Sequence, residues 1–383
     1  MSNFDYSLIK VGIIGGGQLG KMMTQAAKKM GFYVEILDPI PDCSAAQVAD
    51  KQIVGDFYDE NKLREMVSQC DVTTFDIERA GKNLMKLANE GYLIYPSPQI
   101  LYTIQDKTKQ KEMLIKNDIP IPKYKKVEGL DIDFITKEFG FPVVQKACKE
   151  GYDGRGVFVI QDRNDIKKAI KAESFLEKFI DFEKELAINV ARNTKGEIKC
   201  HPVVEMIFDE RANICDMVIA PARVSEDIKR EAEKIGIKTV KALGKEAVGI
   251  FGIEMFLTKD GRILVNEISP RPHNSGHYTI EACLTCQFEQ HIRAVAGLPL
   301  GSTKLLSPAV MINLLGEKGY EGAPIIEGLN EALSIPGLSF HFYDKKITRS
   351  FRKMGHITIL DENLERAIEK AKGVKDFLKI KAR

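Results

Sequence analysis

The stretch Gly252-Ile253-Glu254-Met255-Phe256-Leu257-Thr258-Lys259-Asp260-Gly261-Arg262-Ile263-Leu264-Val265-Asn266-Glu267 carries two acids on two apolar runs. Asp-Gly between such runs predicts a tight hairpin, which would place Glu254 and Glu267 on neighbouring strands of a buried sheet. Facing carboxylates in apolar surroundings are costly unless a cation neutralises them. Mg²⁺ takes one or two carboxylates and completes its octahedron with water and nucleotide phosphates. The hairpin therefore predicts a magnesium site in an ATP-using enzyme; the alternative is a pair of surface acids beside a turn.

A polar loop follows the second acid directly. It reads Ser269-Pro270-Arg271-Pro272-His273-Asn274-Ser275-Gly276-His277 and is dense in groups that hold anions and move protons. Metal site and polar loop are therefore expected to be contiguous.

Composition excludes several classes of protein. The chain has 383 residues, room for about two or three domains. It has 56 Lys plus Arg and 54 Asp plus Glu, so no general attraction to nucleic acid or membrane is expected. The N-terminus lacks the pattern of a signal peptide, and no run approaches the roughly 18 apolar residues of a spanning helix. We expect a cytoplasmic protein with reduced cysteines, and simple burial of the Cys283-x-x-Cys286 pair in preference to zinc or redox use.

Apolar periodicity predicts an α/β chain with four parts, which we place at residues 1–120, 121–182, 183–300 and 301–383. The first part alternates strands and helices and reads as a doubly wound parallel sheet. It closes with one helix from Ser97-Pro98 to about Lys116, which a Pro-rich stop follows. The remaining predicted elements are strands at 143–147, 157–160, 175–179, 184–192, 198–208, 214–222, 339–343 and 357–360, and helices at 132–138, 225–243, 279–295 and 362–372, with one more helix between 160 and 175.

Two glycine-rich turns are candidate phosphate sites. Gly15-Gly16-Gly17-Gln18-Leu19-Gly20 follows a strand and precedes a helix, and Asp38 ends the next strand, as in dinucleotide-binding folds. The pattern requires only a tight turn with anion-seeking N–H groups, so a nicotinamide site is one alternative among several. The second turn, Glu150 to Gly156, lies between two strands and has the composition of a flap that closes over phosphates.

Isolated cations and one acidic segment admit two interpretations each. Lys146 ends a strand beside the flap, and Lys107 lies on a charged helix; each is either a phosphate contact or a solvated charge. The segment from Glu177 to Leu186 fits either a crossing that reads adenine and ribose or a half-buried strand. The basic cluster from Arg352 to His356 is a surface feature unless a phosphorylated substrate binds there.

Taken together, these stretches resemble the ATP-grasp superfamily and, within it, the 5-(carboxyamino)imidazole ribonucleotide synthases of purine biosynthesis. The run from Asn266 to His277 is highly specific for that family. The other matching stretches are Gly12 to Gly20, Leu37 to Pro39, Ala45 to Asp50, Gly151 to Gly156, Phe182 to Leu186, Ala220 to Arg223, Val265 to Cys283 and Arg352 to His356.

The resemblance implies a fold and a reaction. The fold is an N-terminal doubly wound parallel-sheet domain, a small α/β lid domain and a larger α+β C-terminal grasp domain. The reaction joins bicarbonate to the amine of 5-aminoimidazole ribonucleotide, through carboxyphosphate, with ATP and Mg²⁺, and the family suggests a homodimer. Glu254 and Glu267 would hold Mg²⁺, and the implied ATP contacts are Lys107, Lys146, Gly151, Gly154, Gly156, Glu177, Lys178, Phe179, Ile180, Glu185, Asn266 and Glu267.

For the second substrate the resemblance implies two further groups. The catalytic group comprises Asp76, Tyr152, Asp153, Arg155, Arg271, His273, Arg352 and Lys353, and the substrate-binding group comprises Gly17, Gln18, Leu19, Asn274 and Ser275. Either His273 or Asp153 could move the amine proton.

Two departures from the family pattern keep rival functions open. Phe75-Asp76-Ile77-Glu78-Arg79 stands where relatives usually read aromatic-Glu-Phe-Glu-Asn, and Phe208 stands where they tend to have histidine. The rivals are another ATP-grasp carboxylate-amine ligase, a formate-using glycinamide ribonucleotide transformylase, a nucleotide-binding paralogue without turnover, and a nicotinamide-dependent oxidoreductase.

Overall fold

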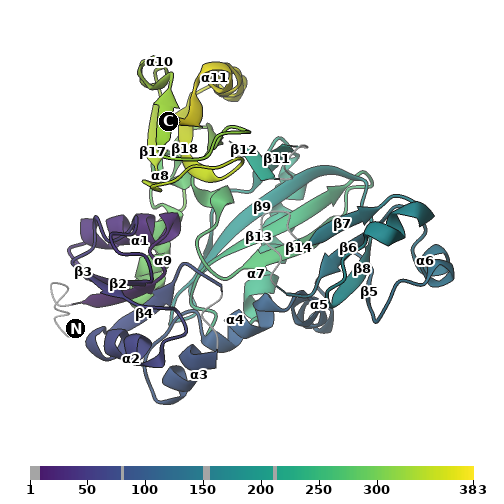
Figure 1. Cartoon of the computed structure of the whole chain (residues 1–383), viewed down its shortest axis with the longest axis horizontal. Helices are drawn as coiled ribbons and strands as arrows, with labels where there is room; N and C mark the ends of the chain where they lie inside the picture. The colour runs from purple at the N-terminus through teal and green to yellow at the C-terminus, as the bar shows by residue number, and fades with distance from the viewer. Residues whose placement is uncertain (1–8, 79–81, 150–155, 210–213) are drawn as a thin grey trace.

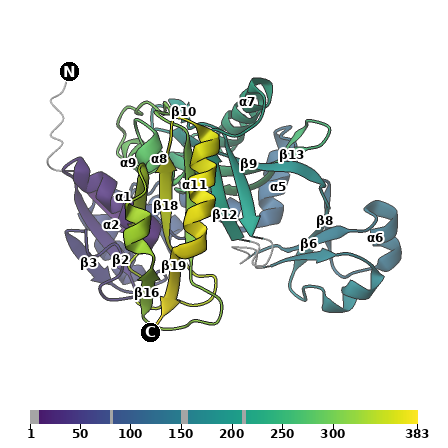
Figure 2. The same cartoon turned by 90° about the horizontal axis from the view of Figure 1, so that it is seen from above.

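The computed structural model describes residues 9–78, 82–149, 156–209 and 214–383. Their strands form a parallel sheet near the N-terminus, a small antiparallel sheet, one long antiparallel sheet and a two-stranded ribbon (Figure 1). Figure 2 shows the small sheet, β5 to β8, standing apart from the N-terminal unit across the long sheet.

The N-terminal unit is the predicted parallel sheet, and its strand order is β3-β2-β1-β4. Its two inner strands are buried along almost their whole length because helices cover both faces. The prediction missed only β3, a short edge strand with weak patterning. The elements are β1 (Lys10–Ile14), α1 (Gln18–Lys29), β2 (Tyr33–Asp38), β3 (Lys51–Val54), α2 (Glu60–Gln69), β4 (Val72–Phe75) and α3 (Lys82–Asn89).

One covering helix of this sheet comes from far along the chain. Helix α9 (Gln287–Val295) packs beside α1, and its Phe288, Ile292 and Val295 join the N-terminal core (Figure 1). The buried ring of His291 accepts from the N–H of Ile250 on Nδ1 at 3.1 Å, and its Nε2 lies 2.7 Å from the hydroxyl of Thr74. Because burial lowers the pKa of His291 to about 3, the ring is neutral, with its proton on Nε2. It therefore joins the N-terminal sheet to the long sheet.

The helix predicted from Ser97 to Lys116 is wrong in one respect, because it breaks at Asp106 into α4 (Pro98–Gln105) and α5 (Lys107–Lys116). Asp106 has an extended backbone, and its side chain caps α5 by accepting the N–H groups of Thr108 and Lys109. The N–H of Lys107 donates to the carbonyl of Cys148 at 2.9 Å. The break makes Lys107 the first residue of α5.

The small sheet has the order β5-β8-β6-β7, with every pair antiparallel. Its core includes Ile135, Val143, Ile160 and Leu176. The three predicted strands and the first predicted helix are confirmed, but β5 was not predicted. The helix expected between 160 and 175 is a 3₁₀ helix. The bounds are β5 (Tyr124–Val127), α6 (Ile132–Glu138), β6 (Val143–Ala147), β7 (Val157–Ile160), η2 (Arg163–Lys168) and β8 (Ser174–Lys178).

The long sheet runs in the order β14-β13-β9-β11-β12-β15-β18-β17, with β10 on β9. Helix α7 (Glu226–Ala242) packs Ala232, Ile235 and Val240 into the same core cluster as Ile188 and Phe251. The strands are β9 (Phe182–Arg192), β10 (Ile198–Cys200), β11 (Val204–Asp209), β12 (Ile214–Ala220), β13 (Gly249–Thr258), β14 (Ile263–Ser269), β15 (Ala309–Leu315), β17 (Leu338–Phe342) and β18 (Lys353–Leu360).

Two predicted elements in this region are interrupted. The strand expected over 198–208 stops after β10 and resumes at β11, because Pro202 between them has no N–H for the ladder. The helix expected over 279–295 splits into α8 (Thr279–Ala282) and α9, since the backbone is extended at Cys283 and again at Cys286. Cys283 is buried and Cys286 caps α9.

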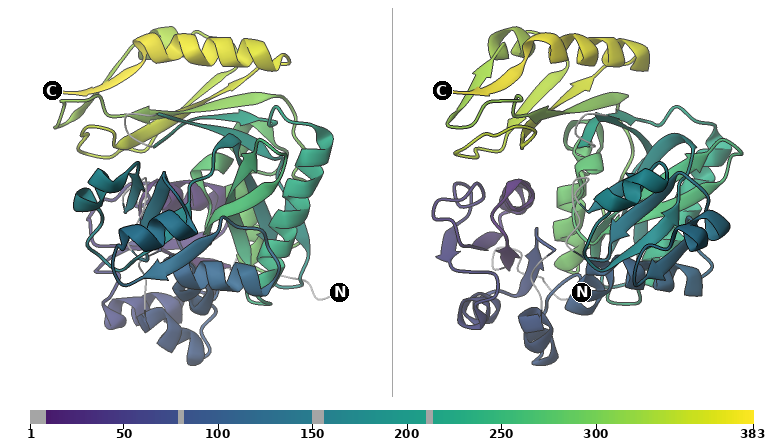
Figure 3. Two further views of the ribbon diagram at one scale, coloured as in Figure 1. Left: turned by 90° about the vertical axis from the view of Figure 1, so that its right-hand side faces the viewer. Right: turned by 45° about the vertical axis from the view of Figure 1, so that its right-hand side comes forward.

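At the C-terminal end, α11 (Leu364–Phe377) lies along one face of the last strands (Figure 3). The prediction found β17, β18 and α11 but missed β15, the ribbon of β16 (Pro324–Glu327) with β19 (Lys379–Ala382), and the short α10 (Leu329–Leu333). In the part of the chain that the structure describes, no helix has both the length and the apolar character needed to cross a membrane.

We expect Ile292→Ala to lower the free energy of unfolding by about 2–5 kcal/mol, because it opens a cavity where α9 meets the N-terminal core. The measurement is urea unfolding followed by far-ultraviolet circular dichroism. Leu284→Ala is the control, since that side chain is 56% exposed and should change stability by less than about 0.5 kcal/mol. Equal effects of the two variants would contradict the packing of α9.

Candidate active site

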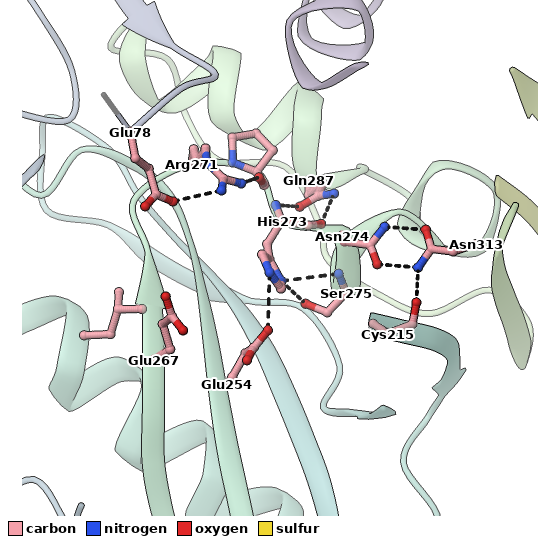
Figure 4. A network of polar contacts seen from close by, with 12 residues as sticks. Glu78, Cys215, Glu254, Glu267, Arg271, His273, Asn274, Ser275, Gln287 and Asn313 are labelled. Carbon is pink, nitrogen blue, oxygen red and sulfur yellow. Dashed lines mark hydrogen bonds and ion pairs between the residues drawn. The ribbon is translucent and has the colours of Figure 1, made fainter. Parts of the chain in front are cut away.

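The acidic hairpin forms as predicted. Strands β13 and β14 pair so that Glu254 stands directly opposite Glu267, with Gly261 in the turn at φ 80°. Opposite residues of an antiparallel pair share a face, so both carboxylates point to the same side of the sheet (Figure 4). The side chains are 21% and 39% exposed. They therefore line a partly open site.

The two acids have unequal electrostatic surroundings. Burial, followed by the charges of Glu267 and Glu185, raises the pKa of Glu254 to about 8. Burial also acts to raise the pKa of Glu267, but Lys107, with Nζ 2.7 Å from its Oε1, brings that pKa below the usual value. Near neutral pH one acid is ionised while the other holds a proton.

This pair fits Mg²⁺. A cation between the two would offset both the burial and the repulsion that keep Glu254 protonated, and the amide oxygen of Asn266 lies next to Glu267 on β14. Within the described residues no group of three His, Cys, Asp or Glu side chains could hold a metal. Magnesium shared with nucleotide phosphates needs only one or two carboxylates.

Two lysines from different elements reach strand β14, and a third shares a buried carboxylate with one of them. Lys107 on α5 reaches Glu267, and Lys146 on β6 places Nζ 2.9 Å from Oδ1 of Asn266 and 2.7 Å from Glu177. Lys111 forms an ion pair with the other oxygen of Glu177 and is 3% exposed. Sequence reasoning missed Lys111. Its signal was the spacing of four residues from Lys107, which puts both on one face of a helix.

The expected adenine and ribose segment begins at the junction of β8 and β9. Lys178 is exposed, Phe179 is 38% exposed and Ile180 is half-buried. Burial raises the pKa of Glu185 to about 7, with Lys146 opposing it in part. The carboxylate of Glu177 faces inward and is only 2% exposed.

Internal bonds hold the loop after β14 rigidly (Figure 4). The N–H of His273 donates to Oε1 of Gln287, whose Nε2 donates back to the carbonyl of His273. Ser275 Oγ lies 2.9 Å from Nδ1 of His273, and Nε2 of that ring lies 3.4 Å from Glu254. Asn274 exchanges two hydrogen bonds with Asn313 on β15. Asn274 and Ser275, predicted as substrate contacts, thus brace the loop, and Gln287 and Asn313 are supports that the sequence did not reveal.

Gly252 permits the close approach of His273. A Cβ at that position would lie 2.4 Å from the Cβ of His273. No side chain heavier than hydrogen fits there without moving the histidine.

Arg271 connects the loop to the N-terminal unit. Its Nη2 lies 2.8 Å from Oε1 of Glu78, which follows β4 (Figure 4). The ion pair keeps the guanidinium beside the carboxyl ends of the N-terminal strands.

Two aspartates of the chain accept the hydrogen bonds that the N–H groups of the first glycine turn donate. Gly16 donates to Asp38 at 2.7 Å, and Gly17 and Gly20 donate to Asp76 at 3.1 and 3.0 Å. A dinucleotide pyrophosphate would need these same donors and would meet two acids, so the geometry disfavours the nicotinamide alternative.

The predicted residues of this turn have different environments. Asp76 is 7% exposed, and burial raises its pKa to about 6 although the N–H of Gly20 and the charge of Arg271 lower it in part. Gln18 is half-buried at the start of α1, whereas Leu19 is buried in the core. Of these, Gln18 is the side chain still available to a ligand.

The basic cluster divides between two places. Lys353 opens β18, and its charge lowers the pKa of Glu254, which places it near the hairpin. Arg352 donates to the carbonyl of Ile347 at 2.6 Å. Only Lys353 is linked to the acidic pair by these contacts.

Several predicted residues lie outside the described ranges, namely Gly151, Tyr152, Asp153, Gly154 and Arg155, together with Arg79 of the first departure and Glu210 and Arg211 after Phe208. Gly156 is described, at φ 74°, and its carbonyl accepts the N–H of Ala147.

Known families match the chain in three successive segments. Residues 8–105 match the ribonucleotide synthetase preATP-grasp domain, residues 112–288 the ATP-grasp domain, and residues 309–370 the phosphoribosylaminoimidazole carboxylase C-terminal domain.

Similar proteins match over most of the chain. The N5-carboxyaminoimidazole ribonucleotide synthase of Bacillus subtilis is 39% identical over 92% of this chain and 91% of its own. The chloroplastic phosphoribosylaminoimidazole carboxylase of Vigna aconitifolia is 41% identical over 93% of this chain, which spans only 65% of that longer relative. The solved N5-carboxyaminoimidazole ribonucleotide synthetase of Thermotoga maritima is 59% identical with a TM-score of 0.91, covering 98% of this chain and 100% of that one.

The raised pKa of Asp76 predicts a pH-dependent effect of Asp76→Asn. An acid whose pKa rises on folding stabilises the folded state fully below its unfolded pKa of about 3.9, and that contribution is lost as pH rises through about 6. The asparagine keeps an acceptor for Gly17 and Gly20 but does not ionise. The free energy of unfolding of the variant, relative to that of the parent, should therefore rise by on the order of 2 kcal/mol from pH 4.5 to pH 7.5. Thermal unfolding at both pH values measures this change. A stability difference between variant and parent that is the same at both pH values would contradict the raised pKa of Asp76.

Proposed function

Because the chain belongs to the N5-carboxyaminoimidazole ribonucleotide synthase family of ATP-grasp enzymes, we propose that it joins bicarbonate to the amine of 5-aminoimidazole ribonucleotide, with conversion of ATP to ADP and phosphate. The observation that carries this proposal is the facing pair of Glu254 and Glu267, with Lys107 and Lys146 beside it. That arrangement suits a triphosphate and its metal. A solved relative from Aspergillus clavatus, 33% identical with a TM-score of 0.88, is described in complex with ADP and 5-aminoimidazole ribonucleotide.

Phosphoryl transfer is the first step. Bicarbonate is a poor electrophile, so one of its oxygens attacks the γ-phosphate and forms carboxyphosphate. Glu254 and Glu267, with Asn266, would hold Mg²⁺, which supplies charge neutralisation for the phosphates. Lys107 and Lys146 bind phosphate oxygens, and this positioning accounts for most of the catalysis.

Carboxyl transfer to the amine is the second step, and it occurs on the side of the polar loop. Arg271 and Lys353 bind the anionic groups, while Gln18 borders the imidazole ribonucleotide. His273, held between Ser275 and Glu254, is placed to take the amine proton. Asp153 on the flap is the other candidate for that proton. Tyr152 and Arg155 are proposed, from the family resemblance, as further contacts of the ribonucleotide and bicarbonate. The segment from Gly151 to Gly156 is proposed to exclude water, which would hydrolyse carboxyphosphate.

We also propose where the nucleotide base binds and how the chain is divided. The nucleotide base and ribose lie between the β8–β9 junction, including Phe179 and Ile180, and Glu185. The four parts divide near residues 120, 182 and 300. The protein works in the cytoplasm as a homodimer formed through the N-terminal domain.

Purified protein with ATP, Mg²⁺, bicarbonate and 5-aminoimidazole ribonucleotide should release ADP and phosphate at a rate that depends on the ribonucleotide. Formate and amino acids, tested as co-substrates, should not replace bicarbonate and the ribonucleotide. Glu267→Gln should reduce kcat by at least about 100-fold, the scale of losing one group that stabilises developing charge. Glu226→Gln is the control, because that side chain is 74% exposed on α7. Ribonucleotide-independent turnover would defeat the substrate assignment, and full activity of Glu267→Gln would defeat the metal role.

Gly252→Ala should impair the reaction with the ribonucleotide without impairing nucleotide binding. The new methyl group displaces His273, so kcat/KM for the ribonucleotide should fall by about 10–100-fold, while the affinity for ADP changes little. Both are measured on the folded variant, by steady-state kinetics and calorimetry. Gly373→Ala is the matched control, because a Cβ there meets no atom within 4 Å. Unchanged kinetics for Gly252→Ala would show that the position of His273 has no part in the reaction.

A further inference from the structure

We infer that Lys111 is a positioning residue for nucleotide binding: it neutralises the buried carboxylate of Glu177 so that Lys146 stays available to phosphate. The inference rests on the proposed function, because it takes Lys146 to be a phosphate ligand. Lys111 itself reaches no open part of the site.

The three charges form a chain across three elements. Lys111 comes from α5, Glu177 from β8 and Lys146 from β6. On the paired strands β6 and β8, Lys146 is opposite Phe175 and Glu177 is opposite Val144, so Lys146 and Glu177 are diagonal neighbours on one face. Glu177 uses one oxygen for each lysine, with 2.7 Å to Lys146.

Lys111 is sealed from water. Its side chain is 3% exposed, and Nζ lies 5.6 Å from the ring centroids of both Tyr124 and Phe175, which pack edge to face. Aromatic faces attract an ammonium group but do not replace a counter-ion. Burial lowers the pKa of Lys111, and Glu177 acts against that decrease. The carboxylate of Glu177 is therefore the counter-ion of this buried ammonium.

Charge balance shows what Lys111 contributes. The group of one carboxylate and two ammoniums has a net charge of +1. Without Lys111, Lys146 would be the only cation among the described residues that pairs with Glu177. It could then reach a phosphate only by leaving that carboxylate buried and uncompensated. Breaking a buried ion pair in this way is strongly unfavourable. With Lys111 present, Glu177 stays neutralised while Lys146 turns to the nucleotide.

The other contacts of Lys146 fit this division of roles. Its second partner is the neutral amide of Asn266, which stands beside Glu267 on β14. A neutral partner is easily exchanged for an anionic one. Glu177 in turn is 2% exposed, so its carboxylate acts on the lysines and not on the ribose.

The test is Lys111→Met, which keeps length and apolar volume but removes the charge. Calorimetric titration with ADP and Mg²⁺ should show affinity weakened by about 10–100-fold, as for loss of one charge-assisted contact. The double variant Lys111→Met with Glu177→Gln should recover to within about threefold of the parent, because no carboxylate then holds Lys146. Recovery on removing a second charge is not expected if Lys111 merely fills space or contacts phosphate itself.

Lys109→Met, on the same helix, is the matched control and should leave affinity unchanged. Parental affinity of Lys111→Met overturns the inference. A double variant that remains as weak as Lys111→Met, with a parental thermal melt, also overturns it. If Lys111→Met fails to fold, the double variant alone decides: near-parental affinity supports the inference and a loss of more than about tenfold refutes it. Failure of the parent protein to bind ADP would instead refute the proposed function.

Discussion

Two carboxylates that the register of β13 and β14 holds opposite each other are the constraint on which the site depends. The hairpin fixes their positions through backbone bonds, so the acids cannot separate to relieve their repulsion. The surrounding side chains offset the negative charge of the two acids to different degrees. Lys107 stabilises the charge of Glu267, whereas Glu254 keeps a proton because burial and the neighbouring acids outweigh the nearby cations. The site is thus prepared for a cation that neutralises both acids.

The cations around this hairpin are placed by backbone features away from it. Lys107 reaches Glu267 because Asp106 interrupts the helix and caps a new one. Lys146 is oriented from the small sheet by Glu177. His273 lies over β13 because Gly252 leaves room for it. The polar atoms of the site therefore come from separate parts of the chain, and their geometry depends on the docking of those parts.

Much of this could be predicted from sequence because the signals were local. The Asp-Gly turn and its apolar flanks specified the acidic hairpin, and the alternation near the N-terminus specified the parallel sheet. The features that were missed are consequences of tertiary contact. Nothing in the sequence near Asp106 shows that the N–H of Lys107 donates to the carbonyl of Cys148. Lys111 was one charged residue among many on a polar helix, and its sequence context does not reveal its ion pair with Glu177. Likewise, the residues Asn274 and Ser275 matched a family pattern, but only the structure shows them bonded to Asn313 and His273.

Helix α9 has a consequence for the order of events during synthesis. The N-terminal strands leave the ribosome early, yet the helix that covers one of their faces, with His291 bonded to Thr74, emerges only after the small sheet and most of the long sheet have been made. Domains that can fold alone do so as they emerge. Here α1 is made early and covers part of that face, but the remaining part stays exposed to water until α9 has been made.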